Sequence, residues 1–315
     1  MKKVLIVGAA GFVGNHLIDF IKVNKKDWDV TATKMPFETI NKEIAVRDLD
    51  ITNIDQINNL LAEIKPDYIF HLAAQSSVAL AWKNPQLTID INIKGTVNLL
   101  DSIRNVVKES RVLLIGSGEE YGNVQIDEIP ITEENKTRPG NIYAVTKVTQ
   151  NMIGHLYAKA YGMDIISTRS FNHTGPDQRI GFAVPDFCKQ IADIELGKQE
   201  PIINVGNLEA LRDFTDVRDV VRAYCLLMEK GKPGNTYNVG SGKAVTIEDI
   251  LNRILSLSTK KITINIDPTK IRPIDVPIIE ADITKIYNDT GWQPEISLDQ
   301  TIQETLDIWR NKEGN

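Results

Sequence analysis

Two side chains in this sequence that could move a proton together are Tyr143 and Lys147, in the stretch YAVTK. Residues four apart lie on one face of a helix, so the phenol and the ammonium are expected to be neighbours. A nearby positive charge lowers the pKa of a tyrosine, and the phenol can then exchange a proton with a hydroxyl or a ketone of a substrate. Because this pair is common by chance, its meaning depends on the elements around it.

Two adjacent carboxylates follow a serine in the stretch IGSGEEYG, residues 115–122. The apolar run 111–117 predicts a buried strand that ends at Ser117. Along an extended backbone side chains alternate between faces, so Ser117 and Glu119 are expected on one face and Glu120 on the other. Glu119 is therefore a candidate acid or base beside the serine, and Glu120 is left out of the predicted site.

A glycine-rich segment, GAAGFVG, comes directly after the first apolar run. Its glycines allow a tight turn and a close approach to a pyrophosphate, whose charge meets the N–H groups at the start of the following helix. Within a βαβ unit, this spacing predicts a dinucleotide site. The residues expected to bind the cofactor in this segment are Gly8, Gly11, Phe12, Val13 and Gly14.

Further cofactor contacts are predicted after the next strands. Lys34 stands where NAD-selective sites usually carry an acid, and a lysine there favours the 2′-phosphate of NADP. A solvated lysine at a strand end is the alternative, so NAD stays open. The remaining candidates are Asp50 and Ile51, beside the adenine, and Leu72, Ala73 and Ala74, where the backbone passes close to a ribose.

Short apolar runs alternate with helical patterns through the first half of the chain, which is typical of a parallel sheet covered on both faces. The predicted strands are 3–8, 29–33, 67–73, 111–117 and 164–170, and the predicted helices are 14–24, 54–64, 92–106 and 143–162. We expect an α/β fold, a doubly wound Rossmann sheet with a smaller C-terminal α/β substrate domain. The predicted Rossmann domain is 1–170 plus about 213–242, and the smaller domain is about 171–212 plus 243–315.

Composition argues against several classes of partner. A net charge of −6 over 315 residues disfavours nucleic acid or an anionic membrane surface, and no apolar run approaches the roughly 18 residues that span a bilayer. The two cysteines, Cys188 and Cys225, lack metal-ligand spacing, so we expect a reducing, cytoplasmic location. No metal site is expected, since the histidines, His16, His71, His155 and His173, stand apart in the sequence.

The order of the glycine segment, LAA, Ser117 and the Tyr143–Lys147 pair resembles the extended short-chain dehydrogenase/reductase family over the whole chain. The resemblance implies that Ser117 hydrogen-bonds the reacting oxygen of a nucleotide sugar and that Tyr143 is the acid/base. It also implies that Lys147 holds the tyrosine and the nicotinamide ribose, with Asn92 supporting the site. Members of the family commonly form homodimers, which here would use the two long helices, 92–106 and 143–162.

Motifs in the second half are similar to the GDP-mannose branch of that family: RSFNHTGPDQ (169–178), VGNLEALRDFTDVRDVVRAY (205–224) and IRPIDVP (271–277). The resemblance implies a GDP-sugar substrate whose diphosphate meets Asn172, Arg212 and Arg272. For each arginine, an ordinary surface ion pair is the alternative. Two further substrate candidates, Val184 and Lys189, come from GFAVPDFCKQI.

The branch contains a dehydratase and a reductase, and the sequence has features of both. Glu119 stands where the dehydratase has an additional acid/base, but Ser117 replaces a threonine, Pro185 and Asp186 replace a basic pair, and the segment after the second strand is short. The resemblance therefore implies NADPH-dependent reduction of the C4 ketone of GDP-4-keto-6-deoxy-D-mannose to GDP-D-rhamnose, with the C4 epimer left open.

Three alternatives are weighed against this reduction. The first is a GDP-mannose 4,6-dehydratase, and the second is an epimerase or dehydratase of another nucleotide sugar. The third is a regulator that binds NAD(P) without turnover, which is disfavoured because the chain keeps both Tyr143 and Lys147.

Overall fold

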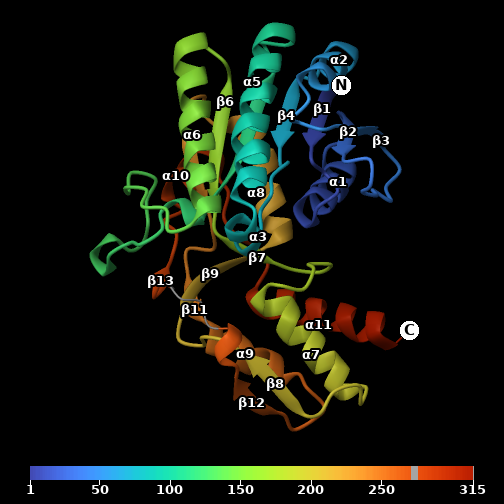
Figure 1. The fold of residues 1–315 in the computed structure, drawn as a ribbon, viewed down its shortest axis with the longest axis vertical. Coiled ribbons are helices and arrows are strands. Elements are labelled where there is room, and N and C mark those ends of the chain that lie inside the picture. Colours follow the sequence, from blue (N-terminus) through green and yellow to red (C-terminus); the bar gives the residue numbers. More distant parts are fainter. Residues whose placement is uncertain (271–275, 315) are drawn as a thin grey trace.

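The computed structural model describes residues 1–270 and 276–314, with side chains through residue 312. A seven-stranded parallel sheet forms the upper part of the molecule in Figure 1. Its spatial order is β10 (Thr236–Val239), β6 (Ile165–Ser170), β5 (Arg111–Ser117), β4 (Tyr68–His71), β1 (Lys2–Val7), β2 (Trp28–Lys34) and β3 (Ala45–Asp48). The chain winds outward in opposite directions from β1 and β4, so the predicted doubly wound α/β sheet is confirmed.

Helices cover both faces of the sheet because its inner strands are apolar on both sides. In β1, Val4 and Ile6 enter one buried core, whereas Leu5 and Val7 enter the other. The first core contains α1 (Phe12–Asn24), α8 (Val217–Lys230) and α10 (Thr284–Thr290). The second contains α2 (Ile54–Ile64), α5 (Gly95–Val106) and α6 (Ile142–Tyr161).

Some strands of the large sheet are not predicted individually, although β10 falls within 213–242, the segment predicted to belong to the Rossmann domain. The edge strand β3 is mostly exposed, and β10 follows α8 far along the chain. Trp292 is fully buried in the first core, and its Nε1–H donates to the backbone oxygen of Asp219 at 3.0 Å. Trp292 and α10 fall within 243–315, the segment predicted to belong to the smaller domain, and they pack in the core of the large sheet.

A smaller unit lies below the sheet in Figure 1 and has its own buried core. Its central strand β9 (Leu211–Asp216) pairs antiparallel with β11 (Ala244–Thr246) and parallel with β7 (Asn172–Thr174) and β13 (Ile278–Ile279). A second, two-stranded sheet joins β8 (Ile202–Val205) to β12 (Thr263–Ile266). The main helices are α7 (Ala183–Glu195), α9 (Ile247–Ser256) and α11 (Leu298–Gly314).

A buried carboxylate fixes the smaller unit against the large sheet. Asp213 on β9 accepts hydrogen bonds from the N–H and the hydroxyl of Ser241, both at 2.6 Å, and from the N–H of Ala281 at 3.1 Å. Burial raises the pKa of Asp213, and these hydrogen bonds act in the opposite direction. Two of the crossings of the chain between the units, after β10 and before α10, are therefore tied to β9, the strand that also carries Arg212.

Candidate active site

The glycine segment forms the turn between β1 and α1, and its three glycines have different surroundings. Gly8 has a φ of +81°, and a Cβ there would lie 2.5 Å from the Ala73 Cα. At Gly14 a Cβ would lie 2.3 Å from the Ala9 oxygen. At Gly11, by contrast, a Cβ would meet no heavy atom within 4 Å. The first and third glycines permit close packing, whereas the second leaves open space at the start of α1.

That open space fits the pyrophosphate of a dinucleotide. Gly11 is the N-cap of α1 without a side-chain cap, and the first turn contains no acidic residue. The N–H groups of Phe12 and Val13 begin the helix, where the positive end of its dipole favours an anion. The N–H groups of Leu72 and Ala73 both donate to the Val7 oxygen and so fix the neighbouring segment.

The adenosine end of the predicted site contains an ion pair. Lys34 ends β2, and its Nζ donates to Oδ1 of Asp48 at the end of β3, at 2.6 Å. Asp50 accepts from the N–H and the hydroxyl of Thr52, and Ile51 is buried. A 2′-phosphate bound by Lys34 would therefore share its ammonium with Asp48, a residue that the sequence analysis missed because β3 has no buried pattern.

Tyr143 and Lys147 lie in the first two turns of α6, beside the end of β5. Nζ of Lys147 donates to the Ile115 oxygen at 2.7 Å and to Oε1 of Gln150 at 3.1 Å. Burial lowers the pKa of Lys147 to about 8. Burial raises the pKa of Tyr143, contrary to the lowering predicted from Lys147, and the Ser117 hydroxyl, by hydrogen bonding to the phenol, acts in the opposite direction to burial. The structure thus brings the predicted serine, tyrosine and lysine together.

Asn92 holds α6 against the segment that follows β4. It lies in a π-helical turn, Asp90–Lys94, immediately before α5. Its Oδ1 accepts from the Gln75 N–H at 2.8 Å, and its Nδ2 donates to the Gln75 oxygen at 3.0 Å and to Oγ1 of Thr146 at 2.9 Å. Since Thr146 directly precedes Lys147, this buried network sets the position of α6.

The prediction that Glu119 and Glu120 lie on opposite faces assumed an extended backbone, and this assumption is wrong. The backbone is not extended after Ser117, because residues Gly118–Glu120 form a 3₁₀ turn capped by Ser117. Glu119 is partly buried, and its Oε2 accepts from Nδ2 of Asn141 at 3.1 Å. Glu120 is fully buried and accepts from the Ser117 N–H. Asn141 is a site residue that its position just before a helix, a typical N-cap signal, could have revealed.

Two residues predicted to bind the diphosphate, Asn172 and Arg212, lie in the smaller unit. Asn172 is exposed on β7 and pairs in register with Phe214 of β9, two residues beyond Arg212. Arg212 is buried, and its Nη1 donates to the Leu211 and Val276 oxygens at 2.8 and 2.7 Å. Arg272 lies outside the described residues.

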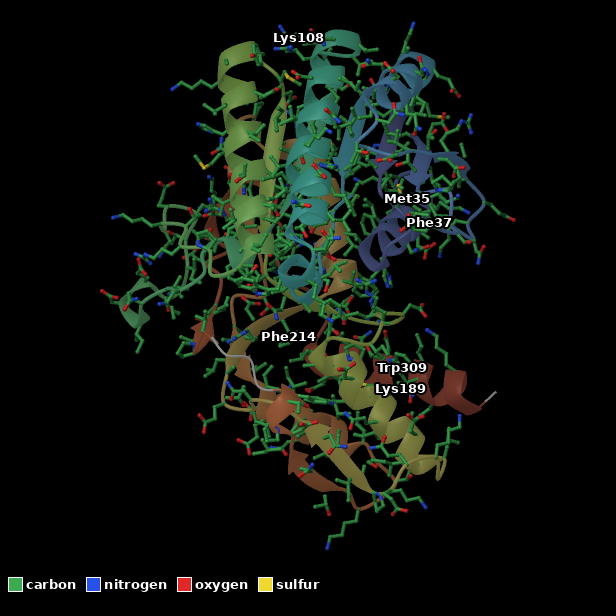
Figure 2. All side chains as sticks on the ribbon, in the orientation of Figure 1. Met35, Phe37, Lys108, Lys189, Phe214 and Trp309 are labelled. Carbon is green, nitrogen blue, oxygen red and sulfur yellow. The ribbon has the colours of Figure 1, made fainter. Side chains whose placement is uncertain are left out.

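Two other candidates are on α7. The side chain of Val184 is buried in the core of the smaller unit, so only its backbone at the start of α7 is left for a ligand. Lys189 pairs with Asp193 one turn later, at 2.6 Å. Figure 2 shows Phe214 between the two units and Lys189 on α7 of the smaller one.

The histidines contact backbone or hydroxyl oxygens. Ring nitrogens of His16, His71, His155 and His173 lie at 2.9 to 3.2 Å from Pro176 O, Thr96 Oγ1, Gly234 O and Phe171 O, respectively. Within 1–270 and 276–312, no group of His, Cys, Asp and Glu side chains is arranged to hold a metal ion. Among the described helices, none is both long and apolar enough to cross a membrane.

Comparison with known proteins identifies the family to which this chain belongs. Residues 5–305 match the family model described as GDP-mannose 4,6 dehydratase. The chain belongs to this family. Its membership confirms the predicted extended short-chain dehydrogenase/reductase, and with it the prediction of an NAD(P)-dependent enzyme.

Individual relatives match over nearly the full chain. A GDP-6-deoxy-D-mannose reductase of Pseudomonas aeruginosa is 30% identical over 311 aligned positions, covering 99% of this chain and 98% of the relative. A GDP-mannose 4,6-dehydratase of Yersinia enterocolitica is 27% identical over 352 positions, covering 97% and 93%. The second alignment is longer than this chain of 315 residues, so that dehydratase carries insertions absent here.

Solved structures share the same fold. The structure of RMD from Pseudomonas aeruginosa complexed with NADPH matches with a TM-score of 0.90 and 30% identity, over 99% of this chain and 100% of the other. A UDP-glucose 4-epimerase of Thermotoga maritima, solved with UDP-glucose, matches with a TM-score of 0.87 and 27% identity, over 99% of each chain.

The glycine turn supports a test of the dinucleotide site. Gly11→Val should leave folding intact, because a side chain there meets open space, but should weaken NADPH binding at least tenfold by blocking the pyrophosphate. Titration of protein fluorescence with NADPH measures the affinity, and thermal unfolding without ligand measures stability. Gly8→Val is the matched control and should instead destabilise the fold, since its φ and its contact with Ala73 exclude a side chain. Unchanged affinity in Gly11→Val would contradict the assignment.

Proposed function

We propose that this protein reduces the C4 ketone of GDP-4-keto-6-deoxy-D-mannose to GDP-D-rhamnose with NADPH. The observation that carries the proposal is the nearly end-to-end match with the reductase, whereas the dehydratase has insertions that this chain lacks. The NADPH complex of the similar RMD structure supports the choice of cofactor. NAD remains an alternative because Lys34 is paired with Asp48.

In the proposed reaction the Ser117 hydroxyl donates a hydrogen bond to the C4 ketone oxygen, and Tyr143 transfers its proton to the same oxygen. The raised pKa of Tyr143 keeps the phenol protonated at neutral pH, as an acid requires. The ammonium of Lys147, one turn along the same helix face, stabilises the phenolate that remains. When bound, NADPH supplies the hydride that C4 receives.

The binding residues divide between the two units. The start of α1 at Gly11 would hold the pyrophosphate of the cofactor, and Lys34 its 2′-phosphate. On the smaller unit, Asn172 and Arg212 would bind the diphosphate of the GDP-sugar. Two parallel N–H groups of a guanidinium match two phosphate oxygens, so Arg212 supplies both charge and orientation.

A dehydratase is the second candidate, and Glu119 favours it. This carboxylate follows Ser117 by two residues, and its charge acts to raise the pKa of Tyr143. Dehydration needs an additional group that removes the C5 proton and assists loss of the C6 hydroxyl, whereas reduction does not. In the proposed reductase Glu119 transfers no proton. Asn141 holds its carboxylate in place, and the carboxylate only orients the sugar.

We also propose a cytoplasmic homodimer formed through α6. Three apolar side chains of this helix, Val145, Met152 and Leu156, are exposed and share one face by their spacing of seven and four residues. Exposed apolar residues grouped in this way mark interaction surfaces. The two free cysteines, Cys188 and Cys225, are buried, which fits a reducing compartment.

The proposed reduction predicts stoichiometric consumption of NADPH when the 4-keto sugar is added. Tyr143→Phe should lower kcat at least ~100-fold, because general acid catalysis typically contributes two to four orders of magnitude. NADPH affinity should change little. Loss of NADPH absorbance measures the rate, and NMR of the product identifies the C4 epimer. Conversion of GDP-mannose to the 4-keto sugar without net NADPH use would establish the dehydratase instead.

Glu119→Gln separates the two candidate reactions. The substitution keeps an oxygen that can accept from Asn141 but removes the carboxylate that would take a proton. A reductase should keep more than a third of its kcat, whereas a dehydratase should lose nearly all turnover. Rates with GDP-mannose and with the 4-keto sugar, measured for Glu119→Gln and for the unchanged enzyme, give the answer.

The dimer predicts a change in molar mass after a single substitution. Leu156→Glu places a charge in the proposed interface and should yield monomers in light scattering after gel filtration. Val23→Glu introduces the same charge at an exposed position of α1 and should leave the dimer intact. An unchanged mass in Leu156→Glu would exclude this face of α6.

A further inference from the structure

Glu120 is fully buried beside the candidate catalytic residues and accepts three hydrogen bonds. Its Oε1 accepts from the Ser117 N–H at 2.9 Å. Its Oε2 accepts from Nδ2 of Asn151 at 2.8 Å and from Nε of Arg169 at 3.0 Å. One carboxylate therefore joins the end of β5, the helix α6 and the strand β6.

All three partners of Glu120 are donors, which suits an ionised side chain. A carboxylate only accepts, whereas a protonated acid or a glutamine would direct a hydrogen at one of these donors. Arg169 supplies the opposite charge that a buried carboxylate needs. Burial is the largest influence and leaves the pKa of Glu120 raised, although Arg169, Ser117 and Asn151 act to lower it.

Glu120 and Lys147 contact adjacent peptide groups of β5. The lysine Nζ donates to the Ile115 oxygen, and the carboxylate binds the N–H of Ser117. Between them, a Cβ at Gly116 would lie only 2.4 Å from Oε1 of Glu120. The ammonium and the carboxylate are thus held on neighbouring parts of one strand.

The groups that face Lys147 come from several elements. On α6, Tyr143 is protonated at neutral pH because burial raises its pKa. From β4, His71 is neutral, since burial lowers its pKa to about 3. From the turn after β5, Glu120 brings a negative charge that opposes the lowering of the Lys147 pKa by burial. Arg169 on β6 offsets part of that charge through its ion pair with Glu120.

We propose that Glu120 is a positioning residue of the reaction, which fixes the backbone of Ser117 and keeps a negative charge beside the ammonium of Lys147. This inference rests on the proposed reduction. Glu119 lies on the partly exposed side of the same turn and has neither role. The carboxylate on which the serine and the lysine depend is thus Glu120, which strand alternation places outside the site.

Glu120→Gln tests both parts of the proposal. The kcat for the 4-keto sugar should fall at least tenfold while KM stays within threefold, because Ser117 is misplaced and the binding residues are not. Activity that needs charged Lys147 is present below its pKa and lost as pH rises through about 8. Without the Glu120 charge, this alkaline loss should move to lower pH by about one unit, the usual spread of pKa values among protein sites.

The matched control is Glu128→Gln. Glu128 also binds an arginine, Arg138, through two hydrogen bonds of 2.6 and 2.8 Å, but it lies on the loop after the site. This variant should keep the kcat and the pH profile. A second readout uses no substrate: the ¹³Cε resonance of Lys147, assigned by its loss in Lys147→Met, should titrate at lower pH in Glu120→Gln.

The outcomes distinguish this inference from the proposed function. If the unchanged enzyme does not reduce the 4-keto sugar, the proposed function fails, and the lysine titration alone decides whether Glu120 acts on Lys147. If the unchanged enzyme does reduce the sugar, the inference is overturned when Glu120→Gln keeps the same kcat and loses activity at the same alkaline pH.

If Glu120→Gln does not fold, Arg169→Lys replaces it. A lysine keeps the positive charge, but it cannot contact Glu120 and the backbone oxygen of Glu133 at once. In the unchanged protein, Nη1 of Arg169 contacts that backbone oxygen at 3.2 Å. The weakened ion pair with Glu120 should lower kcat without raising KM. A full kcat in Arg169→Lys would likewise overturn the role of Glu120.

Discussion

The candidate site depends on a steric constraint at the centre of the large sheet, the close approach of Gly8 to Ala73. The first follows β1 and the second follows β4, the two strands from which the chain winds outward. No side chain fits between them, and the Ala73 N–H donates to the Val7 oxygen at 2.8 Å. The glycine turn and the end of β4 therefore form one surface, as ligand sites in open α/β sheets require.

Buried polar groups hold the other half of the site in place. Asn92 joins Gln75 to Thr146, and Glu120 joins Ser117 to α6 and β6. Each network is buried, so a broken bond would leave a polar group without water and cost about 1–3 kcal/mol. Such networks define a single arrangement of the helix that carries the tyrosine and the lysine.

Local patterns in the sequence were sufficient for much of the fold and for part of the site. The strand and helix order follows from apolar periodicity, and the spacing of Tyr143 and Lys147 follows from helix geometry alone. The position of Glu120 could not be predicted, because alternation assumes an extended backbone and the chain instead turns after Ser117. The ion pair between Lys34 and Asp48 joins residues of two strands, one of which has no buried pattern.

The burial of Trp292 in the core of the large sheet bears on how the chain folds during synthesis. The first six strands of this sheet lie within the first 170 residues, but the seventh, β10, comes after α8. Trp292 and α10 complete the same core from a point near the end of the chain. Domains generally fold as units as they leave the ribosome. Here the core of the large sheet cannot be completed until most of the smaller unit has also been translated.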